Sequence, residues 1–305
     1  MSKAWGLKVK PGDSPAMETM NPKIFYKEIN KLSTKPMSLL KQTLLDLENL
    51  KIVPSKKLGQ NFLVDGNVVD KVMAISDVRN GDVIIEIGPG LGALSEKILK
   101  IGAKLFAIEL DSRLFNFFKS RFVNYNNLWL MHGNAVDFPT AGLPQNMGNF
   151  KVVSNLPYSI SSTWISALLE CCHLPLSISL ITQIETAQRF FASVRTSEIC
   201  PISIFLQSAY DRVCMHRIAA SSFYPEPMVS SAMVSMVRKQ NPFLFKPKTK
   251  QTIRWVFTKR RKQMGGIGKG GCIELQNWLS ECKIATRQRP EEISIQQWKV
   301  LDEFF

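Results

Sequence analysis

The tetrapeptide Asn155-Leu156-Pro157-Tyr158 directly follows a short apolar run and combines residue types that could act on an amine. The exocyclic amine of adenine is a poor nucleophile, because its lone pair is delocalised into the ring. Attack in line with a sulfonium methyl group requires this amine to be oriented and its hydrogens accepted. We expect the Asn155 side-chain carbonyl and the Leu156 backbone carbonyl to do this, with Pro157 stiffening the loop. Tyr158 offers a flat face for a flipped-out base, a contact worth about 1–3 kcal/mol.

The same four residues also fit a simple turn after a strand, so their meaning depends on the rest of the chain. Amine methylation needs neither a covalent intermediate nor a metal. The six cysteines include no CxxC pair, and the three histidines are scattered. We therefore expect reduced thiols and no metal site.

A glycine-rich turn, residues 86–92, follows the first apolar run of the central region. Glycines at such a turn let the backbone approach a ligand closely. The Gly88 and Gly90 spacing also satisfies a relaxed dinucleotide fingerprint, but a third glycine two residues later favours S-adenosylmethionine (SAM). Glu86 could hold the loop or reach the amino-acid end of the cofactor. Glu109, which closes the next apolar run, could accept hydrogen bonds from both ribose hydroxyls, as it would in an NAD enzyme.

Asn134 stands at the end of the third apolar run, where a side chain would meet the adenine amine of the cofactor. Its amide oxygen can accept that hydrogen bond, but without the charge assistance of a carboxylate. We therefore expect Asn134→Asp to tighten SAM binding. Asp137 is an alternative acceptor, and Asn134 could also be a turn residue only.

The elements that must position these residues alternate between buried strands and helices. The strand candidates are residues 83–87, 105–110, 128–131, 152–154, 178–181 and 232–237. Helical spacing is found at residues 37–52 and 94–101, and through Phe115, Phe118 and Phe122. This alternation predicts an α/β fold, a Rossmann-like SAM-dependent methyltransferase with a mainly parallel sheet and helices on both faces. Ligands of such sheets bind beyond the carboxyl ends of the strands.

The chain divides into three predicted parts. Residues 1–52 are an N-terminal extension, partly flexible, whose first 36 residues read as a loose tail. Residues 53–240 are the methyltransferase domain. Residues 241–305 form a small basic helical C-terminal domain with helical segments near residues 253–257, 275–279 and 297–304.

The composition is strongly basic, with a formal net charge of +14. Such an excess favours a polyanionic partner, most often nucleic acid. No apolar run approaches the roughly 20 residues of a membrane span, and the first residues lack the apolar stretch of a signal peptide. We expect a cytoplasmic monomer that binds no membrane.

The motifs between about residues 55 and 300 resemble, in their order, the ribosomal RNA adenine N6,N6-dimethyltransferases, most closely the bacterial small-subunit (16S) enzyme. They are Leu58-Gly59-Gln60-Asn61-Phe62-Leu63, the 86–92 turn, Ile108-Glu109-Leu110-Asp111, the 155–158 tetrapeptide, Phe223-x-Pro225-x-Pro227-x-Val229-x-Ser231-Ala232 and Arg260-Arg261-Lys262. The resemblance implies a cofactor site made by Gln60, Asn61, Leu63, Glu86, Gly88, Gly90, Glu109, Asn134 and Asn155. It also implies that Phe223 presents a second aromatic face to the target base, and we expect Arg260, Arg261 and Lys262 to bind RNA.

The resemblance further implies the reaction. SAM would methylate N6 of adjacent adenosines in a hairpin loop near the 3′ end of small-subunit rRNA, giving N6,N6-dimethyladenosine and S-adenosylhomocysteine. The substrate would be that rRNA or a pre-30S particle.

The chain departs from the family pattern at several positions. Asn134 replaces a usual Asp, Ile184 a usual Lys, and Cys200-Pro201 a usual pair containing Gly. Residues 265–271, where the family continues a helix, read as a flexible basic loop that lies either along an RNA backbone or simply in solvent.

Three other functions compete with this one. A large-subunit rRNA adenine N6-methyltransferase of the macrolide-resistance type is disfavoured by the long C-terminal region. A weakly active ribosome-assembly factor that binds RNA is disfavoured by Asn155 and Tyr158, although Asn134 and Ile184 leave it open. A dehydrogenase is disfavoured because nothing after Glu109 resembles an acid–base site for hydride transfer.

Overall fold

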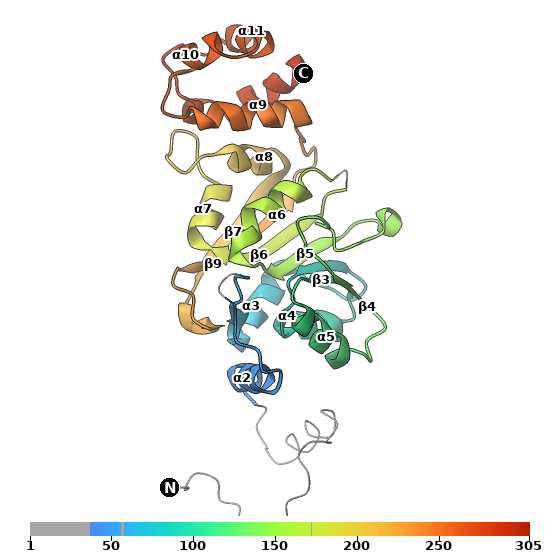
Figure 1. The fold of residues 1–305 in the computed structure, drawn as a ribbon. Helices are drawn as coiled ribbons and strands as arrows, with labels where there is room; N and C mark the ends of the chain where they lie inside the picture. Colours follow the sequence, from blue (N-terminus) through green and yellow to red (C-terminus); the bar gives the residue numbers. More distant parts are fainter. Residues whose placement is uncertain (1–36, 56–57, 172) are drawn as a thin grey trace, which may run out of the picture.

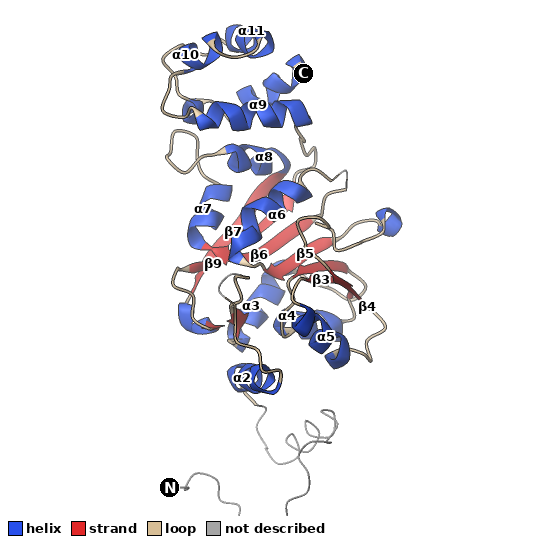
Figure 2. Ribbon diagram, viewed as in Figure 1, coloured by secondary structure: helices blue, strands red, loops and turns tan. Residues whose placement is uncertain are grey.

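The computed structural model describes residues 37–55, 58–171 and 173–305. The predicted loose tail, residues 1–36, lies outside the described residues. A central sheet carries helices on both faces, and the C-terminal helices pack at one end of the molecule (Figure 1, Figure 2). Within the described part of the chain, no helix is both long and apolar enough to span a bilayer.

The described part of the chain contains a seven-stranded sheet with the order β4-β3-β2-β5-β6-β9-β7. Its strands are β2 (Val83–Ile87), β3 (Lys104–Glu109), β4 (Leu128–His132), β5 (Lys151–Asn155), β6 (Ser177–Gln183), β7 (Tyr210–Ile218) and β9 (Ser231–Arg238). The first five strands in this order are parallel, whereas β9 and β7 run antiparallel to their neighbours. A separate two-stranded sheet pairs β1 (Phe62–Leu63) with β8 (Phe223–Tyr224). The mainly parallel sheet is confirmed.

Every strand predicted from the sequence is present, but β7 was missed, as were the two-residue strands β1 and β8. Only the two end residues of the edge strand β7 are buried, and its register shifts between Arg212 and Cys214. An edge strand with one open side needs no continuous apolar run, so hydrophobic patterning does not reveal it.

Helices cover both faces of the sheet. The helices of the described residues, including those at the two ends of the molecule, are α2 (Leu39–Asn49), α3 (Gly66–Ser76), α4 (Ala93–Ile101), α5 (Ser112–Arg121), α6 (Ser161–Leu168), α7 (Ile184–Phe190), α8 (Pro201–Ala209), α9 (Pro247–Thr258), α10 (Met264–Lys269), α11 (Ile273–Glu281) and α12 (Ile295–Val300). Strand β2 shows how one buried strand serves both faces. Ile84 packs in the apolar cluster with α3, α4 and α5, whereas Ile85 and Ile87 pack in the cluster with α6, α7 and α8.

The C-terminal helices share that second apolar cluster with the sheet. Trp278 and Trp298 are fully buried and stack with ring centroids 4.9 Å apart. Buried Lys250 on α9 donates to Glu170, just after α6, at 2.7 Å. The predicted boundary near residue 240 falls in the segment between β9 and α9.

The prediction of a flexible loop at residues 265–271 was wrong, because α10 occupies most of this segment. Met264 and Ile267 are buried. A Cβ on Gly268 would lie 2.6 Å from Leu279 Cδ1, and one on Gly265 would lie 2.8 Å from Thr286 Cβ. The glycines therefore permit close packing of this helix rather than flexibility.

Candidate active site

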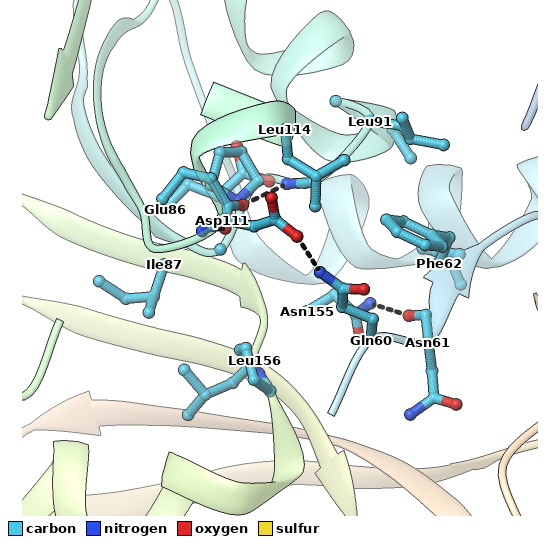
Figure 3. A pocket seen from close by; sticks show the side chains of 18 of the residues that line it. Gln60, Asn61, Phe62, Glu86, Ile87, Leu91, Asp111, Leu114, Asn155 and Leu156 are labelled. Atoms are coloured by element: carbon cyan, nitrogen blue, oxygen red, sulfur yellow. Dashed lines mark hydrogen bonds between the residues drawn. The ribbon is translucent and has the colours of Figure 1, made fainter. Parts of the chain in front are cut away.

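A cavity of about 230 Å³ opens at the carboxyl ends of β2, β3 and β5 (Figure 3). The structure brings most of the predicted site residues together around it. Those lining the cavity are Gln60, Asn61, Leu63, Glu86, Gly88, Gly90, Glu109, Asn134, Asn155, Leu156, Pro157 and Tyr158. Phe223, Arg260, Arg261 and Lys262 do not line it.

The glycine turn lies between Pro157 on one side of the cavity and Phe62 on the other. Gly88 and Gly90 have φ angles of +63° and +57°, which favour glycine. A Cβ on Gly88 would lie 3.2 Å from the Pro157 ring, and one on Gly90 would lie 3.2 Å from the Phe62 ring. The turn is therefore in close contact with both the 155–158 tetrapeptide and residues 58–63, the N-terminal segment of the cavity.

Glu109 ties the glycine turn to the end of β3. Its carboxylate accepts hydrogen bonds from the backbone N–H groups of Gly90 (3.2 Å), Leu110 (2.8 Å) and Asp111 (3.0 Å). Burial raises the pKa of this carboxyl, while the three N–H groups oppose that shift. A carboxylate held this rigidly at the strand end could accept hydrogen bonds from ribose hydroxyls.

Asp111 is held ionised beside Glu109. The Arg113 guanidinium, 2.7 Å away, lowers the pKa of Asp111 to about 2. Gln60 donates to the same carboxylate at 3.1 Å, as the dashed line to Asp111 in Figure 3 shows. The N-terminal segment is thus anchored on this side of the cavity.

Glu86 has a different protonation state. Its side chain is buried, and the Ser95 hydroxyl donates to it at 2.6 Å. Burial raises the pKa of Glu86 to about 8, against the Ser95 hydrogen bond, and nearby Glu109 raises it further. In the protein alone, this carboxyl keeps its proton at neutral pH. A ligand that brings a positive charge here would favour ionisation.

Asn155 is oriented by the backbone of Asn61, the residue just before β1. Its Nδ2 donates to the Asn61 carbonyl at 2.9 Å (Figure 3). The amide oxygen of Asn155 is then the atom available to accept from a bound amine. The Leu156 N–H donates to the Ile181 carbonyl at 3.0 Å, which fixes the tetrapeptide to β6.

Asn134 uses both ends of its amide within its own turn. Its oxygen accepts from the Val136 N–H at 3.0 Å, and its Nδ2 donates to Asp137 at 3.0 Å. Asn134 therefore lines the cavity in a fixed orientation, with Asp137 directly beside it.

Sequence reasoning missed the contribution of α2 to this cavity. Leu39, Gln42, Thr43 and Asp46 all line it. Asp46 is 1% exposed and forms an ion pair with Arg121 on α5 at 2.7 Å. Residue type alone does not reveal this role, because carboxylates are ordinary on an amphipathic helix and α2 also carries Glu48.

Phe223 does not present an aromatic face to the cavity. It is 2% exposed, lies in an apolar core cluster, and is paired through its backbone with Leu63. A base cannot stack on it in this conformation, so the expected second stacking surface is not supported. Its neighbour Tyr224 is the exposed aromatic of this short strand.

The three predicted RNA-binding cations are not equivalent. Arg260 donates to the Thr196 carbonyl at 2.9 Å, and its Nε lies 3.6 Å from Glu291. Arg261 and Lys262 are exposed. Arg260 thus holds the end of α9 against the segment between α7 and α8, and of the three cations only Arg261 and Lys262 face solvent.

This fold and cavity define a SAM-dependent methyltransferase. A crystal structure of a dimethyladenosine transferase from Plasmodium falciparum matches with a TM-score of 0.64 and 25% identity, over 79% of this chain and 95% of that chain. The 23S rRNA methyltransferase ErmE shares the fold, with a TM-score of 0.54 and 20% identity over 80% of this chain and 99% of that chain.

The family profile described as ribosomal RNA adenine dimethylase matches residues 37–304, and the chain belongs to this family. It is 40% identical to the ribosomal RNA small subunit methyltransferase A of Opitutus terrae, over 81% of this chain and 92% of that protein. It is 33% identical to the protein of the same name from a Sulfurihydrogenibium species, over 81% of this chain and 95% of that protein. The predicted family is confirmed, and the dehydrogenase alternative is excluded.

Proposed function

We propose that the protein transfers methyl groups from SAM to N6 of adjacent adenosines in a hairpin loop near the 3′ end of small-subunit rRNA. The products are N6,N6-dimethyladenosine and S-adenosylhomocysteine. One observation carries the proposal: the tetrapeptide suited to an amine lies against the glycine turn, with Gly88 in close contact with Pro157. Methyl donor and acceptor would therefore meet in one cavity.

The residues of this chain would act by orientation. When bound, SAM supplies a methyl group activated by its sulfonium sulfur. The Asn155 side-chain oxygen and the Leu156 carbonyl accept the amine hydrogens, and the Tyr158 ring stacks on the base. With SAM bound, the N–CH₃ bond would form as the S–CH₃ bond breaks, and the amine proton would pass to solvent. The reaction as proposed uses no metal, because the sulfonium is itself the activating group.

The proposed partner is small-subunit rRNA or a pre-30S particle, bound by a cytoplasmic monomer. The net charge of +14 and the exposed Arg261 and Lys262 support a polyanionic substrate.

The test is incubation with labelled SAM and unmethylated small-subunit rRNA, free and in assembly particles, followed by mass spectrometry of the nucleosides. We expect dimethyladenosine in the small-subunit RNA, and label confined to large-subunit RNA would contradict the assignment. Asn155→Ala should lower transfer by at least roughly 100-fold while RNA binding persists, because the amine loses its acceptor. Unchanged turnover of this variant would remove Asn155 from the mechanism.

A further inference from the structure

The phenol of Tyr158 has a partner on a distant segment of the chain. Its hydroxyl lies 2.5 Å from the Ser231 hydroxyl, a hydrogen bond in which either oxygen could be the donor. Ser231 is completely buried and is the first residue of β9. Tyr158 lines the cavity and begins a short 3-10 turn, Tyr158–Ile160. The contact therefore joins the base-binding tetrapeptide to the antiparallel side of the sheet.

We propose that Ser231 is a positioning residue that fixes the Tyr158 ring in the orientation needed to stack on the target adenine. This inference rests on the proposed function of the cavity. A phenol ring without a partner for its hydroxyl can tilt about its side-chain bonds. A ring held at its far end presents one plane to the base, at no ordering cost when the base arrives.

The backbone around Ser231 is suited to this role because it is held on both sides. Ser231 pairs with Gln183 on β6 and with Ile218 on β7. The carbonyl of the preceding Ser230 accepts from the Ile184 N–H at 2.9 Å. The Ser231 hydroxyl thus projects from a rigid part of the sheet.

A second pair of hydroxyls secures the other end of the Tyr158 turn. Ser161, the first residue of α6, lies 2.7 Å from Thr182 on β6, and both are buried. The turn is consequently attached to the sheet through Tyr158 at its start and through Ser161 just after its end. Two independent attachments indicate that the ring position is specified by the tertiary structure.

The hydrogen bond between Tyr158 and Ser231 orients the ring and takes no part in proton transfer. Burial raises the pKa of Tyr158, which outweighs the opposing effect of the Ser231 hydrogen bond. The phenol remains protonated at physiological pH, so it is not a general base for the amine proton.

A double-mutant cycle separates positioning from general structural damage. The variants are Tyr158→Phe, Ser231→Ala and their combination, with the exposed neighbour Ser230→Ala as a matched control. Loss of one such hydrogen bond should lower single-turnover methylation by roughly 3- to 10-fold in each single variant. The double variant should lose no more than the worse single one, and SAM affinity should be unchanged throughout. If the fold-losses of the two single variants multiply in the double variant, the inference is overturned.

Carbon-13 NMR of protein labelled at tyrosine Cζ tests the contact without any activity. The chain has five tyrosines, and Tyr158→Phe identifies the resonance of interest. Ser231→Ala should shift that resonance, and Ser230→Ala should not. An unmoved resonance would overturn the role of Ser231. Absence of methylation by the wild-type protein would instead overturn the proposed function.

Discussion

Replacing Glu86 by Gln should change the pH dependence of folding in a defined direction. The folded pKa of Glu86 is about 8, against an ordinary value of 4.5, because the carboxyl is buried. Between these pH values the folded protein binds this proton and the unfolded chain does not. The contribution of Glu86 to stability is therefore fully present below about pH 4.5 and declines as the pH rises to about 8. Gln has no proton to lose, so this decline should disappear in Glu86→Gln.

The size of the effect follows from the width of this window. Each pH unit within it corresponds to at most about 1.4 kcal/mol of unfolding free energy. The whole window would then amount to at most about 5 kcal/mol, and relaxation around the buried charge reduces it. We expect Glu86→Gln to gain about 2 kcal/mol relative to wild type between pH 5 and pH 8.

Urea unfolding of both proteins at pH 5, 6, 7 and 8, without cofactor, measures this difference. Ser95→Ala is a useful companion variant, because the Ser95 hydroxyl lowers the pKa of Glu86. Its removal should raise the folded pKa of Glu86 further, so that the loss of stability continues above pH 8. A difference between wild type and Glu86→Gln that stays constant from pH 5 to pH 8 would refute the reasoning.

Two further predictions concern RNA and cofactor binding. Arg261→Ala with Lys262→Ala should reduce the slope of log K against log salt by about 1–2, whereas Arg260→Ala should mainly lower the melting temperature. Filter binding from 50 to 200 mM salt and thermal unfolding distinguish these outcomes, and an unchanged slope would mean that neither cation meets a phosphate. Asn134→Asp combined with Asp137→Asn should tighten SAM binding by roughly 3- to 10-fold in calorimetry, because a carboxylate accepts more strongly than an amide. Asn134→Asp alone should gain less SAM affinity, because it replaces the 3.0 Å hydrogen bond between Asn134 and Asp137 by two carboxylates that repel each other. An equal gain in affinity would show that Asp137 does not affect SAM binding.

The strands of the parallel sheet and the residues at their carboxyl ends could be predicted from the sequence. Each buried strand is a local apolar run, and the residues that follow it in the chain must lie at the same edge of a parallel sheet. Glu86, Glu109, Asn134 and Asn155 were found in this way, and the structure places all four around one cavity. Ordered motifs then indicated the family, although no single motif was specific.

Other features depend on contacts between segments far apart in the chain, which local patterning does not contain. Phe223 and Tyr224 are adjacent aromatics, and only the pairing of β8 with β1 decides that the first is buried and the second exposed. The glycine-rich sequence of α10 is typical of a flexible loop, and only the tertiary structure brings Leu279 close against Gly268.

The sequence by itself thus determined the residue types of the 155–158 tetrapeptide and its place at the end of a strand, because both are local properties. The tertiary structure alone decided what orients it. Asn61 lies opposite Asn155 because the N-terminal segment crosses the cavity. Ser231 reaches Tyr158 because β9 is hydrogen-bonded beside β6. Burial and partnership depend on which elements pack together, so they emerge only when the whole chain has folded.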